Sequence, residues 1–200
     1  PTRRSSDLID NISPIGNGKH LRLTFTKDNQ KITALKFSTT LQNFEFKVGD
    51  IVDIAVNLHS SNYNNIESLS IFIKDIKMSD IDVDDFIEHT CLYEAFCRGE
   101  FLEIENLDEI LPSKEDFSNF YRYLRSEKEI KSSIYTLCYR IRHLKINLFK
   151  LFIILDVFSE INLINFKKEV YFYTVNLNQV TNKVNLEDSM ILKKLKERGI

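Results

Sequence analysis

The sequence HLRLTFTKDNQKITALKF, residues 20–37, is the strongest indication of a fold in this chain of 200 residues. Apolar side chains alternate with polar ones at Leu21, Leu23 and Phe25, which predicts a strand with one buried face. Residues 27–30 are polar and predict a turn, and residues 31–37 predict a second strand. We expect the inward side chains of this second strand to be Ile32, Ala34 or Leu35, and Phe37.

The residues that follow add further strands. A turn at residues 48–50 precedes a segment rich in β-branched residues at 51–58. A polar loop is expected at residues 60–65, and a last strand at 68–76, where Leu69, Ile71 and Ile73 alternate with other residues. Four or five strands, without a helix long enough for a βαβ unit, predict a small closed barrel. The OB-fold is the commonest barrel of this size that binds single strands.

The second half of the chain has helical periodicity. Ser113 and Asp116 form the pattern of a capping box, which predicts that a helix begins there. The elements expected after it are helices at about 131–143 and 148–161, strands at 162–166 and 170–175, and a helix at 186–198. Helix, short turn, helix and hairpin is the element order of a winged helix. The predicted fold class is therefore α+β, a small OB-like β-barrel followed by a mainly helical, winged-helix-like domain.

Charge is distributed unevenly along the chain. Residues 78–112 contain one basic and 11 acidic residues, and such a surface repels phosphate. A divalent-metal site is one interpretation of its aspartates, although the Gly and distal Glu of a calcium loop are missing. Acids placed at a helix N-terminus, where the helix dipole favours them, are the better interpretation. The aspartates concerned are Asp80, Asp82, Asp84 and Asp85.

The predicted barrel carries the residue types that bind single-stranded nucleic acid, namely aromatic rings for stacking and cations for phosphates. Arg22 and Lys36 flank apolar positions and are expected to face outward, and Tyr63 lies in the predicted polar loop. Ordinary solvated surface explains the same pattern. Phe37 shares the register of Leu35, which assigns it to the core. The candidate nucleic-acid contacts are Lys19, His20, Arg22, Lys36, Tyr63 and Lys74.

A second basic stretch lies in the helical half, with tyrosines between its cations. Its members are Arg122, Arg125, Lys128, Lys131, Arg140, Arg142 and Lys145. Two interpretations are open, a second nucleic-acid surface or a solvated helix face whose tyrosines pack on the core, and we favour the second.

Neither a metal site nor a membrane span is indicated. The cysteines, Cys91, Cys97 and Cys138, are odd in number and lack metal-type spacing, which favours a reducing, cytoplasmic setting. The longest apolar run, residues 148–158, is too short to cross a bilayer. Residues 1–8, PTRRSSDL, match the translation of a sequencing adapter. We therefore exclude them from the fold, and we expect the reading frame to begin inside a longer gene.

Several segments, taken in order, resemble one family. Residues 18–23 (GKHLRL), 34–37 (ALKF), 48–55 (VGDIVDIA) and 68–77 (SLSIFIKDIK) resemble successive strands of the OB domain of RecJ single-stranded-DNA exonucleases. Residues 111–117 (LPSKEDF), 155–160 (LDVFSE) and 183–189 (KVNLEDS) resemble segments of the extra C-terminal domain of RecJ from Firmicutes-type bacteria. Asn65 replaces the Gly that is usual in one loop, and Asn tolerates a left-handed backbone.

The resemblance implies a parent protein that is a 5′-to-3′ exonuclease on single-stranded DNA, acting in recombination and repair. Its catalytic Asp-His-His motifs and their divalent metal, Mn or Mg, would lie in upstream domains. These motifs are absent here. We therefore expect no catalytic residue, metal or cofactor in this chain, and no DNA hydrolysis by it alone.

The expected domains are an OB domain at residues 9–78, an acidic linker and helix at 79–112, and a helical RecJ C-terminal domain at 113–200. The expected partners are single-stranded DNA for the barrel and a protein for the helical half, in a monomer without membrane contact. A different interpretation of the helical half is a structural or protein-docking module that does not touch nucleic acid. Its net acidity, 17 basic and 21 acidic residues after residue 77, favours that interpretation.

Overall fold

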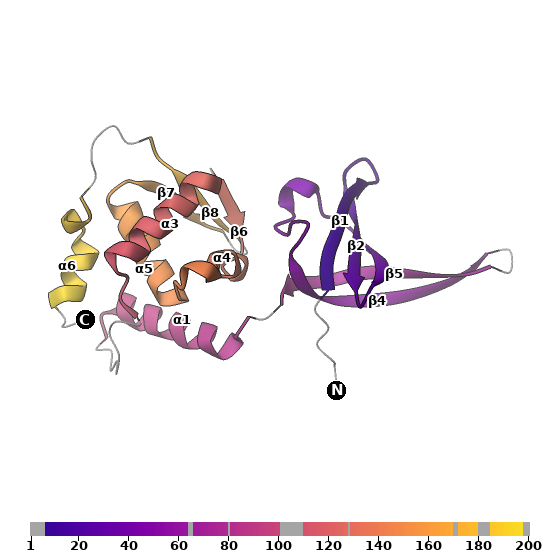
Figure 1. The fold of residues 1–200 in the computed structure, drawn as a ribbon, viewed down its shortest axis with the longest axis horizontal. Coiled ribbons are helices and arrows are strands. Elements are labelled where there is room, and N and C mark those ends of the chain that lie inside the picture. Colours follow the sequence, from indigo (N-terminus) through magenta and orange to yellow (C-terminus); the bar gives the residue numbers. More distant parts are fainter. Residues whose placement is uncertain are drawn as a thin grey trace. The chain divides into compact units, whose positions relative to one another are not determined.

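The structure is a computed structural model, and its chain divides into two compact units, residues 1–80 and 81–200, which we describe separately (Figure 1). The structure describes residues 7–63, 66–79, 81–100, 110–127, 129–169, 172–179 and 185–197.

The first unit is a closed five-stranded barrel with the strand order β1-β2-β3-β5-β4 (Figure 1). Its strands are β1 (Asp7–Ile15), β2 (His20–Lys27), β3 (Gln30–Lys36), β4 (Ile51–Tyr63) and β5 (Ile66–Met78). Neighbouring strands are antiparallel except for β3 and β5, whose parallel pairing of Leu35 with Phe72 closes the ring. Asp28 and Asn29 both have positive φ, 47° and 62°, as a two-residue hairpin turn between β2 and β3 requires. The predicted OB-like barrel and the α+β class are confirmed.

The barrel core follows the alternation in the sequence. Leu21, Leu23 and Phe25 are buried as predicted. The sequence left open whether Ala34 or Leu35 faces inward, and the structure buries Ala34. Ile32 pairs with Phe25 but remains 37% exposed near the end of the short strand β3. The other buried apolar side chains of the unit are Ile9, Phe46, Val52, Ile73 and Met78.

The two longest strands form an arm beyond the barrel. β4 and β5 pair along their whole length, from Val52 with Met78 to Tyr63 with Ile66 (Figure 1). The loop predicted at residues 60–65 is therefore wrong in extent, because the structure places residues 60–63 in β4. In this part of the arm, polar residues of β4 pair with residues of β5. The hydroxyl oxygens of the paired Ser61 and Ser68 lie 2.7 Å apart. A polar sequence does not exclude a strand whose two faces are both solvated.

The barrel begins earlier than predicted. β1 includes Asp7 and Leu8, which pair with Val52 and Ile51, so two residues of the adapter-like peptide belong to the barrel. The Asp7 carboxyl is buried, and its pKa is raised overall. Burial is the main cause; the charge of Lys27 opposes the shift, and the charge of Asp53 adds to it. The expected exclusion of residues 7 and 8 from the fold is therefore wrong.

The second unit combines helices with a three-stranded sheet of order β6-β8-β7. Its central elements are α3 (Lys114–Glu127), β6 (Glu129–Ser132), α4 (Ile134–Ile141), α5 (Leu148–Glu160), β7 (Ile164–Lys168) and β8 (Tyr173–Leu177). This is the predicted winged-helix-like order with one additional strand, β6, before the helix pair. Lys131 lies in β6 rather than in the helix predicted at 131–143, because residues 129–132 pair with β8. The helix α4 begins only after its N-cap, Ser133, whose side chain accepts a hydrogen bond from the Thr136 amide.

Two further helices belong to this unit, α1 (Val83–Arg98) and α6 (Met190–Glu197). The predicted capping box at α3 is present, since the Ser113 amide donates to Asp116 and the Asp116 amide donates to Ser113 Oγ. The helix predicted at 186–198 is shorter, because the 3-10 helix η3 (Leu186–Asp188) precedes α6.

Helix α5 is the core of the second unit, and α1, α6 and β7 pack against it. Nine of its 13 residues are buried. The Tyr93 hydroxyl of α1 donates a 2.6 Å hydrogen bond to Asp156 of α5. Burial and this hydrogen bond raise the pKa of Tyr93, and burial also raises the pKa of Asp156.

Across the described helices, none combines the length and the apolarity that crossing a membrane would require.

Candidate nucleic-acid interface

Four aromatic rings form a row across the outside of the barrel. His20 of β2 lies 4.9 Å from Phe37, measured between ring centroids, and Phe37 lies 5.4 Å from Phe72 of β5. The row continues from Phe72 to His59 of β4 at 6.1 Å. The neighbouring rings are tilted or edge-to-face rather than parallel. We call these four residues the ring row. Each of its rings comes from, or directly follows, a different strand.

Strand register explains why these rings share one face. Leu21 and Leu23 are buried, so Arg22 between them faces outward, and Arg22 pairs with Leu35. Leu35 in turn pairs with Phe72, and directly opposed side chains project to the same face of a sheet. Phe72 therefore faces outward, while its neighbour Ile73 is buried.

Phe37 is on the surface, and its assignment to the core is wrong. Its side chain is 48% exposed. Ala34 is the inward residue of β3, so Leu35 faces outward, and Phe37, two residues further along, lies on the same outward face. Ser38, directly after Phe37, takes a left-handed conformation with φ 54°. A left-handed backbone is costly for a residue with a side chain, and such residues often occur at functional sites. Phe37 contacts His20 and Phe72 instead of the core.

The His20 ring is fixed by two backbone positions. The Ser38 amide donates a 2.9 Å hydrogen bond to His20 Nδ1. On the other side of the ring lies Gly16, where an added Cβ would stand 2.9 Å from His20 Cδ2 and 3.6 Å from Nε2. The turn before β2 thus requires a residue without a side chain at this position.

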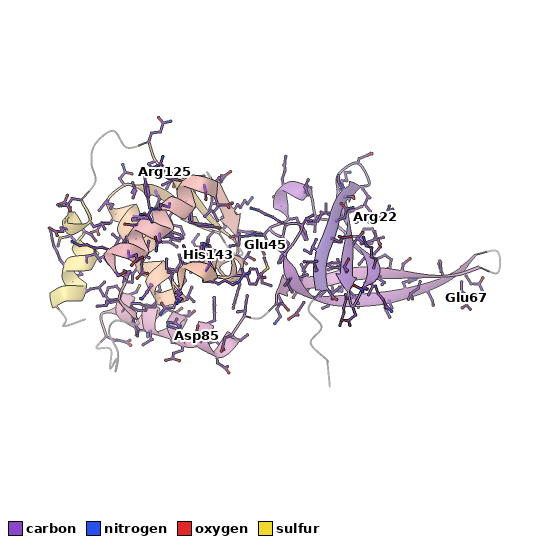
Figure 2. The ribbon with its side chains drawn as sticks, viewed as in Figure 1. Arg22, Glu45, Glu67, Asp85, Arg125 and His143 are labelled. Carbon is purple, nitrogen blue, oxygen red and sulfur yellow. The ribbon has the colours of Figure 1, made fainter. Side chains whose placement is uncertain are left out.

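The predicted cations differ in their placement. Lys19 is exposed. Arg22 is exposed on the outward face of β2, two residues after His20, and was predicted to face outward (Figure 2). Lys74 is exposed at a bulge, where the pairing moves from Ala55–Asp75 to Val56–Ile73.

Lys36 was predicted to face outward, but the structure places it on the inward face. It pairs with the buried Leu21, so its side chain starts on the inward face of β3. Its ammonium Nζ donates a 2.8 Å hydrogen bond to the Lys74 carbonyl of β5. This contact gives Lys36 a structural role, and it is a weaker candidate for phosphate contact than Arg22.

Tyr63 is the last residue of β4 and not a loop residue, and its side chain lies outside the described residues, as does Asn65. The structure thus brings together His20 and Arg22 of the predicted set, and adds Phe37, Phe72 and His59. The alternation in the sequence could have indicated one of the added residues, Phe72. Phe72 lies between Ile71 and Ile73 in a strand whose odd-numbered positions were assigned inward, which leaves a large aromatic ring on the outer face.

Asp82 caps the N-terminus of α1, and Asp84 and Asp85 lie in the first turn of this helix. The Asp82 side chain accepts hydrogen bonds from the Asp84 and Asp85 amides at the start of the helix. This confirms the helix-terminus interpretation for the described aspartates, while Asp80 lies outside the described residues. Within the part of the chain that the structure describes, no group of three or more His, Cys, Asp or Glu could hold a metal ion.

Arg142 of the second basic stretch binds the end of a helix. It donates to the Tyr139 carbonyl at 2.7 Å and stacks over the Tyr139 ring at 3.8 Å. Cations at helix C-termini are stabilised by the free carbonyls and the helix dipole. These contacts support the structural interpretation of the stretch, of which Lys128 lies outside the described residues.

The strand order and the closure of β3 against β5 define the first unit as an OB-like barrel. Residues 3–75 match the family model of the RecJ OB domain. The match begins within the adapter-like peptide and ends in β5, so the whole second unit, residues 81–200, lies beyond it. A search of curated proteins found no match.

Proposed function

We propose that this chain is the non-catalytic, C-terminal part of a RecJ-type 5′-to-3′ single-stranded-DNA exonuclease, and that its barrel binds and guides the DNA strand. The observation that carries the proposal is the match of residues 3–75 to the RecJ OB domain. The ring row adds a surface of suitable chemistry on that domain.

The ring row supplies faces for unpaired bases. Stacking of a base on an aromatic side chain contributes about 1–3 kcal/mol and is available only when the base is free of a duplex partner. Phe37, which is 48% exposed, and His59 are the exposed members of the row. Arg22 beside the row and Lys19 in the preceding turn would contact phosphates, and Lys74 is a further candidate. The barrel thus favours single strands without reading sequence.

Hydrolysis belongs to the parent protein in this proposal. The Asp-His-His motifs and their Mn or Mg would be contributed by upstream domains, and the barrel would hold the strand as it approaches them. We therefore propose no catalytic residue in this chain. The proposed nucleic-acid contacts are the ring row, Lys19, Arg22 and Lys74.

For the second unit we propose a structural or protein-docking role as the C-terminal domain of such an enzyme. In DNA-binding helix-turn-helix proteins a recognition helix enters the major groove. The corresponding second helix of the α4–α5 pair is mostly buried, with α1 packed against it. A helix with nine of its 13 residues buried has little surface to present to a groove. We propose the domain division that the sequence predicted, except that the barrel begins at residue 7 and not at residue 9.

Binding of a labelled oligodeoxythymidylate, followed by fluorescence anisotropy at several salt concentrations, tests the proposed function. We expect saturable binding that weakens as salt rises, and Arg22→Ala should reduce the slope of log affinity against log salt by about 0.7, the value for one single-strand phosphate contact. Lys31→Ala is the matched control, because Lys31 is on β3 but pairs with Asp10 at 2.7 Å. Absence of salt-dependent binding by the folded chain would contradict the proposal.

A further inference from the structure

We infer that His20 meets a nucleic-acid strand as a neutral hydrogen-bond donor through Nε2, with Ser38 and Gly16 as the residues that position it. The inference rests on the proposed function and specifies how one ring of the row is used. Its ligand is an acceptor atom of an unpaired nucleotide, either a phosphate oxygen or a base oxygen or nitrogen.

The contact of Ser38 assigns the proton on the ring. A backbone amide can only donate, so the 2.9 Å hydrogen bond from the Ser38 amide requires Nδ1 to be an acceptor. The proton of the neutral imidazole is then on Nε2. The imidazolium form would have donors at both nitrogens and would lose the bond from Ser38. His20 in this arrangement is therefore a directed donor and not a cation.

Backbone conformation supports this arrangement on both sides of the ring. Ser38 has φ 54°, a conformation disfavoured for residues with a side chain, and its amide hydrogen bond to His20 stabilises it. Gly16 lies beside the Cδ2–Nε2 edge, since a Cβ there would stand 2.9 Å from Cδ2 and 3.6 Å from Nε2. The His20 and Phe37 rings meet edge to face at an interplanar angle of 71°. His20 thus joins the ring row, and a side chain at position 16 would crowd its Cδ2–Nε2 edge.

Two glycines of the same turn give a matched pair of variants. Gly16 and Gly18 both have positive φ, 56° and 79°, so alanine strains the backbone at either position. Only at Gly16 does the added Cβ meet the His20 ring, because nothing lies within 4 Å of a Cβ at Gly18. We expect Gly16→Ala to weaken oligodeoxythymidylate binding by about three- to tenfold more than Gly18→Ala, the range for one lost hydrogen bond.

A second pair of variants tests the donor without altering the turn. The amide nitrogen of His20→Gln can take the place of Nε2, whereas His20→Asn can accept from Ser38 but has no donor at the Nε2 position. We expect His20→Gln to bind more tightly than His20→Asn by about three- to tenfold. Long-range proton–nitrogen correlation spectra of the full chain at neutral pH should show the neutral Nε2–H tautomer of His20.

Three results would overturn the inference, and one of them concerns the proposed function as well. An imidazolium or an Nδ1–H tautomer would contradict the proton assignment, and equal affinity of His20→Asn and wild type would contradict the donor role. Both leave strand binding by the barrel intact. Failure of the wild-type chain to bind any oligonucleotide would instead overturn the proposed function together with the inference, while the tautomer would still be measured in the free protein.

Discussion

At the level of single side chains, two carboxyl groups on α5 should give opposite pH dependences. Asp156 is one turn before Glu160 on this helix. Burial raises the pKa of Asp156, against the effect of its hydrogen bond from Tyr93, and Glu160 raises it further. Burial also acts to raise the pKa of Glu160, but hydrogen bonds from Ser189, Met190 and Ile191 and the charge of Lys194 lower it overall.

We predict that Asp156→Asn stabilises the second unit increasingly as pH rises. A carboxyl with a raised folded pKa binds its proton more tightly in the folded state than in the unfolded state, where the pKa is about 3.9. The stability that this protonated carboxyl contributes is therefore lost as pH rises from that value through the folded pKa. Asparagine removes this loss and keeps an acceptor for the Tyr93 hydroxyl. Urea unfolding at several pH values measures the effect.

Glu160→Gln is the control with the opposite sign. The stability contributed by a carboxyl with a lowered pKa is present above the unfolded value, about 4.3, and is lost as pH falls through the folded pKa. Glu160→Gln should therefore be destabilising at neutral pH and nearly neutral in acid. Equal pH dependences for Asp156→Asn and Glu160→Gln would contradict the assignment of the two carboxyl environments.

At the level of elements, the β4–β5 arm should be dispensable for folding of the barrel. Its described outer residues, 60–62 and 67–69, are all exposed, and Leu69 is 63% exposed. Replacing residues 60–69 by Asn-Gly would join His59 directly to its partner Ser70 through a two-residue turn. We predict a change in the free energy of unfolding within about 0.5 kcal/mol, as for surface substitutions that touch no core side chain.

The shortened arm retains His59 and Phe72, so binding of a short oligonucleotide should also be retained. Thermal unfolding and anisotropy titrations on the same protein separate the two effects. A barrel that no longer folds would show that the arm contributes to the core. Lost binding in a folded barrel would show that the strand contacts residues beyond the ring row.

For the molecule as a whole, we predict that strand binding belongs to the first unit. A shortened chain of residues 1–79 contains the complete closed barrel with its own core and should bind oligodeoxythymidylate with the affinity of the 200-residue chain. Residues 81–200, with their mostly buried helix α5, should bind weakly. Strong binding by residues 81–200 alone would contradict the structural or docking role proposed for them.

The sequence predicted the barrel and most of its core, because alternation at Leu21, Leu23 and Phe25 reports burial on one face of a strand. It did not predict the ring row. Phe37 was assigned to the core through its shared register with Leu35, but Ala34 is the inward residue of β3, and Leu35 and Phe37 both face outward. The neighbourhood of His20, Phe37, Phe72 and His59 depends on the order of four strands in the closed sheet.

Two other differences have similar causes. Lys36 is inward in register with Leu21, and its long side chain reaches the Lys74 carbonyl of β5, so its polarity predicted the wrong face. Lys131 lies in a strand because residues 129–132 pair with β8, a contact more than 40 residues away along the chain. Capping residues such as Ser113 and Asp116, whose partners are local, were predicted correctly.

The affinity of the double variant Phe37→Ala/Phe72→Ala for oligodeoxythymidylate tests the ring row as the binding surface of the barrel. Val48→Ala is the control, since Val48 is 60% exposed and lies outside the row. With stacking at about 1–3 kcal/mol per base, we predict affinity at least about tenfold weaker than wild type, with the folded state intact by circular dichroism. A folded double variant that binds as tightly as the wild type and Val48→Ala would contradict the account.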